Sequence, residues 1–182
     1  MVDYLKKYLT DKGFDLPRLL HDDFFLAIKL TFNTGYYISA AKLLVSFIDT
    51  MGYLESGDGG ADPFRRWLDQ HVDLRSLNIT SEELWEHRNS LLHMSTLNSR
   101  KVSGGHVRRL IAYVGQLPPG SPSEDKEAKW FSLLGLIQAI AQGISHYIQT
   151  TGQAPERWPV FFERYDQILS DSRVLHFELS DS

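Results

Sequence analysis

The chain has 182 residues, of which 42% are hydrophobic and 23% are charged, and its formal net charge is −4 at pH 7. These values are ordinary for a soluble globular protein with a sizeable core, and we expect residues 1–182 to form a single domain. The absence of cysteine excludes disulfides, thiolate catalysis and thiolate metal sites. The net negative charge does not favour a protein that coats nucleic acid with its whole surface.

The first third of the chain predicts helices. Residues 1–15 carry a short N-terminal helix, expected over Asp3–Leu9. Apolar residues recur at spacings of three and four from Phe24 to Ile48, which predicts one long or kinked helix. The alternative is a break near Asn33–Gly35, where small residues interrupt the pattern.

Two further helices follow a glycine-rich connector that lacks the Gly-Lys-Ser/Thr of a phosphate-binding loop. Pro63 opens the first of them. Thr80 and Glu83 form a capping box, which marks the start of a helix over the sequence "ELWEHRNSLLHMS". We expect His87 on the surface of that helix, paired with Glu83 one turn back.

The second half predicts less regular structure before two last helices. The segment from 97 to 120 is either a short strand or the beginning of another helix. Ser123 is expected to cap an apolar helix from about Glu124 to Thr150, and a last helix is expected near Val160–Leu169, followed by a tail over 170–182.

No Asp, Glu, Lys or Arg lies between Trp130 and Pro155, so this stretch is long enough to span a membrane. A spanning helix would place Gln138, Gln142 and His146 in hydrocarbon, and we therefore expect a buried central helix and no membrane contact. The elements together predict an all-α fold, a four- to five-helix bundle with long irregular loops and room for a short strand pair. The N-terminus does not resemble a secretory signal, and a cytoplasmic location is expected.

Arg88 is the most informative residue, because it falls among Leu84 and Leu91 on the apolar stripe of its predicted helix. An arginine keeps its charge, and burying it unpaired is costly. Asn89 and His93 share a neighbouring face, whereas Arg88 and His93 lie roughly 140° apart on an α-helix. We therefore expect two copies of the chain to pack along this stripe, so that both sets of side chains meet in one cleft.

Each of these residues also has a structural interpretation. His93 could be hydrogen-bonded to Glu86 or to a backbone group. Arg88 could be buried against a carboxylate, for which the candidates are Asp22, Asp23 and Asp49.

Between His87 and Ser123 the chain has five basic residues and no acidic one. Such a segment attracts an anionic ligand, and the alternative is a solvated basic loop. We predict RNA-binding residues here, namely Arg100, Lys101, Arg108 and Arg109. No two of the seven histidines are three or four apart, so no helical metal chelate is predicted, and no cofactor is expected.

The string "RNSLLH" resembles the signature of the HEPN superfamily, the higher eukaryotes and prokaryotes nucleotide-binding domains. The motif covers some six residues, and the helical layout is similar over most of the chain. The resemblance implies a metal-independent endoribonuclease of HEPN type, often a toxin or antiphage effector, that acts as a homodimer, in some cases with an antitoxin protein. It implies that His93 is the general acid or base, that Arg88 stabilises the phosphoryl charge and that Asn89 orients the phosphate or His93.

One position departs from the pattern. In the branch of the family whose antitoxin is a nucleotidyltransferase, a tyrosine lies two residues after the histidine, and here that residue is Ser95. Regulation by nucleotidylation of that tyrosine is therefore not predicted. The alternative functions are a catalytically inactive HEPN-like module that binds a nucleotide, RNA or a protein partner, and a purely structural interaction protein.

Overall fold

The computed structural model describes residues 2–94, 100–117, 128–152 and 154–172. The longer helices are α3 (Leu26–Asn33), α4 (Tyr37–Ser56), α5 (Ala61–His71), α6 (Ser81–Asn89), α8 (Leu133–Gly152) and α9 (Trp158–Ser172). The short ones are α1 (Val2–Lys6), α2 (Leu16–Leu20) and α7 (Arg100–Ser103). π-Helical turns span His21–Phe25 and Ser90–Met94, and 3-10 turns span Leu74–Leu77 and Pro155–Arg157. The predicted helical character is confirmed for the described part of the chain.

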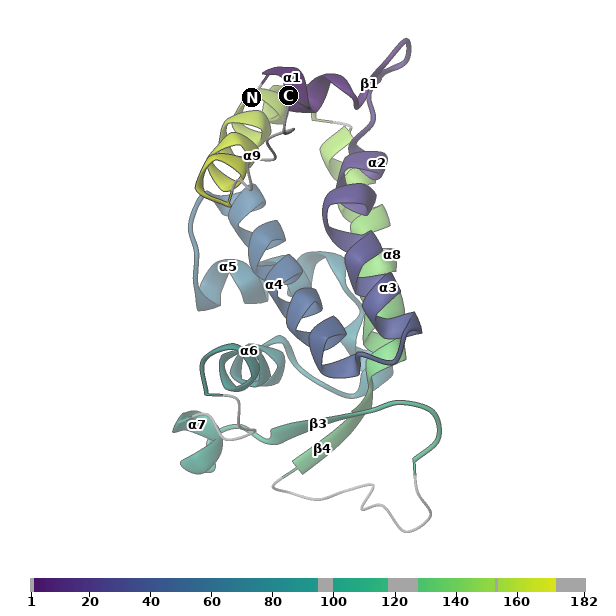
Figure 1. Cartoon of the computed structure of the whole chain (residues 1–182). Coiled ribbons are helices and arrows are strands. Elements are labelled where there is room, and N and C mark those ends of the chain that lie inside the picture. The colour runs from purple at the N-terminus through teal and green to yellow at the C-terminus, as the bar shows by residue number, and fades with distance from the viewer. Residues whose placement is uncertain (1, 95–99, 118–127, 153, 173–182) are drawn as a thin grey trace, which may run out of the picture.

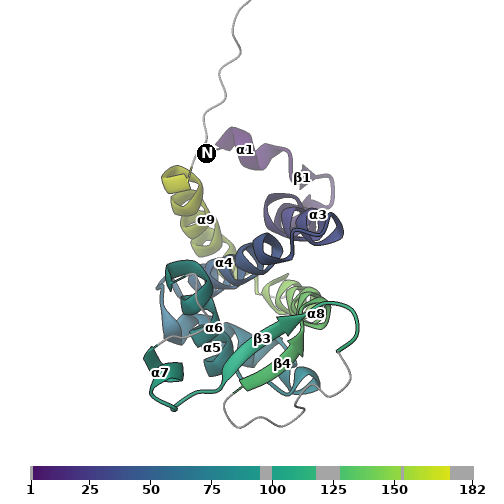
Figure 2. The ribbon, with the colours of Figure 1, turned by 60° about the horizontal axis from the view of Figure 1, so that its bottom comes forward.

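Two small sheets accompany the helices. Strands β1 (Leu9–Thr10) and β2 (Gly13–Phe14) form an antiparallel hairpin. Strands β3 (Arg109–Tyr113) and β4 (Ala128–Ser132) pair in parallel, with Ile111 opposite Trp130. A parallel pair needs a crossover between its strands, and this pair therefore joins segments that are distant in the sequence (Figure 2).

Helix α4 lies at the centre of the molecule (Figure 1). It packs against α3, α5, α6 and α9, and its inward face contributes fully buried side chains such as Leu44, Ile48 and Met51. Helix α6, helix α7 and the β3–β4 pair lie together at the end of the molecule opposite α1 (Figure 1). The candidate residues on α6 are therefore held between the central helix and the parallel strands.

The long helix predicted from Phe24 onward is wrong, and the alternative of a break is correct. Helix α3 ends at Asn33, and α4 begins at Tyr37. Gly35 adopts a φ of 85°, a left-handed conformation that glycine tolerates at no steric cost. This turn lets α4 pack back against α3.

The helix predicted from Glu124 also begins later than expected. Residues 123–127 lie outside the described part of the chain, and residues 128–132 form β4 instead of helix. Helix α8 starts at Leu133, where the Gly135 N–H donates to Ser132 Oγ at 3.0 Å. Ser132 therefore satisfies a first-turn amide in the way a capping serine does.

Helix α8 packs in the core through one face, so the predicted burial is correct for that face and wrong for the polar one. Ile140 and Tyr147 are buried, whereas Gln138, Gln142 and His146 are exposed. None of the described helices combines the length and the apolar character needed to cross a bilayer. The polar residues that argued against a membrane span thus form the solvent-facing side of α8.

The N-terminal helix is shorter than predicted, because the hairpin of β1 and β2 follows it directly. Tyr4, Tyr8 and Tyr165 each donate a hydroxyl hydrogen bond to the carboxylate of Asp23. These bonds fasten the N-terminal segment to α9.

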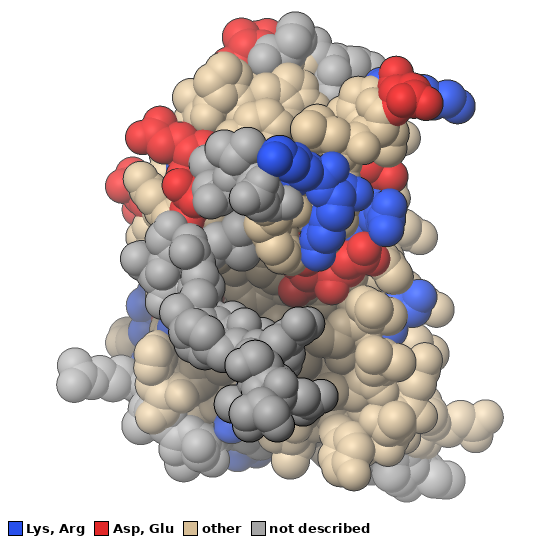
Figure 3. Space-filling view, turned by 45° about the horizontal axis from the view of Figure 1, so that its top comes forward, with Lys and Arg blue, Asp and Glu red and all other residues tan. Residues whose placement is uncertain are grey.

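Basic and acidic side chains lie next to each other on the face shown in Figure 3.

Helices α4 and α5 lie close together at Gly52. A Cβ atom on Gly52 would lie 2.9 Å from the backbone carbon and oxygen of Pro63. Alanine favours a helix over glycine by about 1 kcal/mol, but the Pro63 backbone cannot rotate away. We expect Gly52→Ala to lower the free energy of unfolding by about 2 kcal/mol, measured by urea denaturation.

Gly59→Ala is the matched control, because no atom lies within 4 Å of a Cβ atom placed there. We expect that variant to be as stable as the parent or slightly more stable. Equal stability of the Gly52→Ala variant and the parent would show that α4 and α5 can separate without cost.

Candidate active site

The structure brings Arg88, Asn89 and His93 together within one chain. Arg88 Nη1 lies 2.6 Å from His93 Nε2 and donates a hydrogen bond of 3.1 Å to Asn89 Oδ1. The capping box of Thr80 and Glu83 that begins this helix is confirmed. From the sequence, one copy could bring Arg88 and His93 together only through the reach of the arginine, and the structure shows this contact within a single chain.

The backbone after Asn89 explains this convergence. Helix α6 ends at Asn89, and Ser90–Met94 forms a π-helical turn. The wider i→i+5 bonding of such a turn brings a residue five positions later closer to the same side than the α-helix geometry assumed from the sequence. His93 is five residues after Arg88, so the turn places its imidazole beside the guanidinium.

Asp49, on the central helix α4, holds Arg88 from the other side. Asp49 Oδ2 lies 2.7 Å from both Nε and Nη2 of Arg88. The side chains of Arg88 and Asp49 are only 17% and 24% exposed. The Trp85 ring packs on the guanidinium, with its centroid 5.0 Å from Cζ. Arg88 is thus fixed by a carboxylate and an aromatic face, and its Nη1 side remains directed at His93.

The sequence interpretation named Asp49 only as one of three structural partners for Arg88. The other two have different partners, since Asp22 pairs with Arg18 and Asp23 accepts from tyrosines. One signal distinguishes Asp49 in retrospect. It is the only acidic residue between Phe24 and Leu54, in a run whose other residues are uncharged or basic.

Two opposite effects act on the pKa of Asp49. Burial raises the pKa of Asp49, and the hydrogen bond and positive charge of Arg88 act against that rise. Arg88 stays charged in either case, because a guanidinium does not lose its proton in proteins. The His93 Nε2 atom accepts from Arg88, which assigns the hydrogen of a neutral imidazole to Nδ1. His93 therefore presents a lone pair at Nε2. Glu86, the predicted partner of His93, lies instead 3.8 Å from Lys101.

The site lies on an open surface, because the His93 side chain is exposed. Three cavities of about 280, 590 and 730 Å³ are lined by other residues. Small substrates are generally bound in enclosed pockets. An exposed histidine beside a largely buried arginine is better suited to a macromolecule that approaches from solvent.

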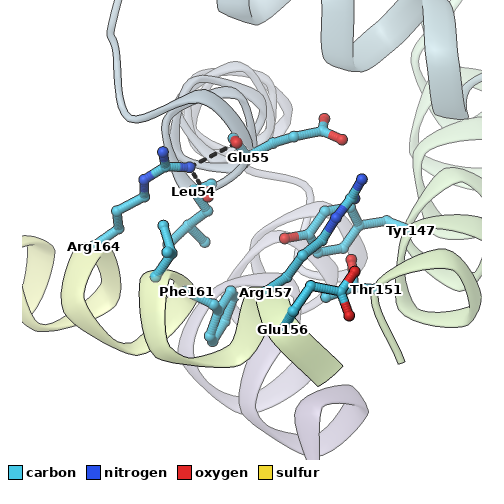
Figure 4. A pocket seen from close by; sticks show the side chains of 9 residues that line it. Leu54, Glu55, Tyr147, Thr151, Glu156, Arg157, Phe161 and Arg164 are labelled. Carbon is cyan, nitrogen blue, oxygen red and sulfur yellow. Dashed lines mark hydrogen bonds between the residues drawn. The ribbon is translucent and has the colours of Figure 1, made fainter. Parts of the chain in front are cut away.

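The 280 Å³ cavity lies between α4, α8 and α9 and has a structural explanation (Figure 4). Arg164 donates through Nη1 to the carbonyl oxygens of Leu54 at 2.9 Å and Glu55 at 2.6 Å. A cation there complements the C-terminal end of α4. Burial raises the pKa of Tyr147 in the same cavity to about 12, so this hydroxyl stays protonated at neutral pH.

The predicted RNA-binding residues are partly engaged with acids of α6. Lys101 lies 2.8 Å from Glu82, and Arg108 Nε lies 2.5 Å from Glu83 of the capping box. Arg109 is half-buried, and its Nε has no hydrogen-bond partner among the described residues. The side chain of Arg100 lies outside the described part. An RNA phosphate would therefore compete with existing ion pairs at Lys101 and Arg108.

His87 is buried, so its predicted place on the surface is wrong. Its ring packs edge-on against Phe131 of β4 and is hydrogen-bonded to the backbone of Leu110 in β3. Glu83 pairs with Arg108 instead. Burial lowers the pKa of His87 to about 4, against the weaker opposing effect of the Leu110 bond. The imidazole is therefore neutral in the folded protein at neutral pH.

This burial predicts a loss of stability in acid. An unfolded imidazole has a pKa of about 6.5, so between about pH 6.5 and 4 the unfolded chain binds the proton that folded His87 does not. The contribution of His87 to stability is complete above that window and falls by about 3 kcal/mol as the pH drops through it. His87→Gln should remove this part of the pH dependence of urea unfolding. Identical pH slopes in parent and variant would contradict a buried neutral His87.

No protein-family model matches this chain, and neither a curated protein nor a solved structure matches it. A functional proposal therefore depends on the geometry of the four residues Arg88, Asn89, His93 and Asp49. It also depends on the sequence motif, which these comparisons do not test.

Proposed function

We propose that this protein is a metal-independent endoribonuclease of HEPN type, and that it acts as a homodimer and a toxin or antiphage effector. The observation that carries the proposal is the 2.6 Å contact between Arg88 Nη1 and His93 Nε2, with Asn89 on the same nitrogen. A guanidinium matches phosphate oxygens, and imidazole exchanges a proton near neutral pH. A proton acceptor and a cation that stabilises the phosphoryl charge both promote RNA cleavage by the 2′-hydroxyl.

The contacts of Arg88 suggest how substrate would activate the base. Arg88 Nη1 now donates to His93 Nε2 and Asn89 Oδ1. A phosphate oxygen that takes over this donor releases the lone pair of His93 Nε2. His93 then accepts the 2′-hydroxyl proton while the 2′-oxygen forms a bond to phosphorus and the bond from phosphorus to the 5′-oxygen breaks.

Arg88 stabilises the negative charge that develops on the phosphoryl oxygens. Asp49 and Trp85 hold its guanidinium in place before substrate binds. Such preorganised donors are a large source of catalysis. The proton returns to the 5′-oxygen from the imidazolium of His93, in the same copy or in a second one. The products are a 2′,3′-cyclic phosphate and a 5′-hydroxyl.

Incubation of purified protein with tRNA, mRNA and rRNA in EDTA tests the proposal. We expect discrete cleavage products on a denaturing gel, because no step uses a metal. Intact RNA in all three classes, at protein in excess over substrate, would contradict it.

A second candidate function is a catalytically inactive module that binds RNA, a nucleotide or a protein. The ion pair between Arg88 and Asp49 favours it, because this contact explains a half-buried arginine without any chemistry. The two candidates differ in one outcome. An inactive module still binds RNA after the substitution His93→Ala, and neither the parent nor the variant forms a cleavage product.

A further inference from the structure

A second pair of polar side chains lies away from α6. His71, at the end of α5, and His146, on α8, face each other with their Nδ1 atoms 3.0 Å apart. Both line a cleft of about 730 Å³ that also includes Asp69 and Asp73. Two imidazole nitrogens from separate helices therefore meet at the wall of an open, partly acidic cleft.

Glu55 orients the inner histidine. His71 Nε2 lies 3.3 Å from Glu55 Oε1, so the ring hydrogen is assigned to Nε2 and the lone pair to Nδ1. That lone pair points at His146. Histidines that bind a metal through one ring nitrogen commonly donate a hydrogen bond from the N–H of the other to a carboxylate.

The helices that carry the pair are in close contact. A Cβ atom on Gly143 of α8 would lie 3.1 Å from the carbonyl oxygen of His71. The His71 side chain is 6% exposed, and its ring packs against Trp67 and Tyr147. Its nitrogen is therefore held in position before any ligand arrives, which a precise site requires.

We propose that His71 and His146 bind a divalent transition metal such as Zn²⁺, Ni²⁺ or Cu²⁺ through their Nδ1 atoms. Tetrahedral coordination with bonds of about 2.0–2.1 Å places two nitrogens about 3.3 Å apart, close to the distance already present. His146 is exposed and moves its hydrogen to Nε2, where it meets solvent. Imidazole favours these metals over Mg²⁺ and Ca²⁺.

The site is an open one. In the described residues no group of three or more His, Asp or Glu side chains could hold a metal, so water fills the other positions. The metal links the end of α5 to α8 and therefore stabilises the fold. This role is independent of RNA cleavage, which we expect in EDTA.

Calorimetric titration of Zn²⁺ into untagged, metal-free protein tests the site, together with the thermal unfolding midpoint. We expect binding that raises the midpoint, no effect of Mg²⁺, and an affinity at least about 10-fold lower in His146→Ala. Glu55→Gln should lower the affinity by about 10-fold, because it weakens the orientation of His71.

His106→Ala is the matched control, since His106 is also exposed and lies outside the pair. It should bind Zn²⁺ as the parent does. No binding by the parent, or equal binding by the parent and His146→Ala, would overturn the proposal and would leave the two imidazoles as a hydrogen-bonded pair.

Discussion

Replacement of His93 by alanine should lower the rate of RNA cleavage by about 10²–10⁴-fold, the usual contribution of a general acid or base. The side chain is exposed, and its described contact is the hydrogen bond from Arg88. We therefore expect the free energy of unfolding to change by less than about 1 kcal/mol. Initial cleavage rates and urea unfolding of the same preparation measure both quantities.

His21→Ala provides the control, because it removes an exposed imidazole that lies outside both the Arg88 site and the basic segment. It should cleave RNA at the parent rate. Unchanged cleavage by His93→Ala would contradict the assignment of His93, whereas loss of cleavage in both variants would point to an effect on the protein as a whole.

Asp49→Asn should affect both stability and activity. The substitution keeps the shape of the side chain but removes the charge that faces Arg88 across 2.7 Å. Because the pair is mostly buried, we expect the free energy of unfolding to fall by about 1–3 kcal/mol. The guanidinium also loses its anchor, and a displacement of about 1 Å can cost about 10²-fold in rate.

Asp22→Asn is the comparison for this variant, because Asp22 forms an exposed pair with Arg18 and such pairs contribute about 0–1 kcal/mol. It should leave both quantities near the parent values. If Asp49→Asn lowers stability but cleaves at the parent rate, Asp49 supports the fold only and does not position Arg88 for chemistry.

Local signals predicted several features correctly. The capping box at Thr80 and Glu83 marked the start of α6. Pro63 indicated the first turn of α5, although that helix already begins at Ala61. Because a buried arginine needs a partner, three carboxylates were predicted as candidates, and one of them, Asp49, is the observed partner of Arg88. Each of these inferences depends on residues a few positions apart or on the cost of burying a charge.

The features that the sequence did not predict depend on contacts between residues distant in the sequence or on local backbone conformation. The burial of His87 results from β3 and β4, whose parallel pairing joins residues near 110 and 130. The π-helical turn after Asn89 has no marker in the residue types, yet it brings His93 to Arg88. The ion pairs of Lys101 and Arg108 likewise arise when the basic segment folds against α6.

The most direct test of the proposed chemistry uses an RNA oligonucleotide that the protein cleaves and the same oligonucleotide with one 2′-deoxy nucleotide at the cleavage position. Attack by the 2′-hydroxyl, with His93 as the base, predicts a 2′,3′-cyclic phosphate end from the RNA. It also predicts no cleavage at the modified position. Cleavage of the 2′-deoxy substrate at the original bond would contradict this mechanism.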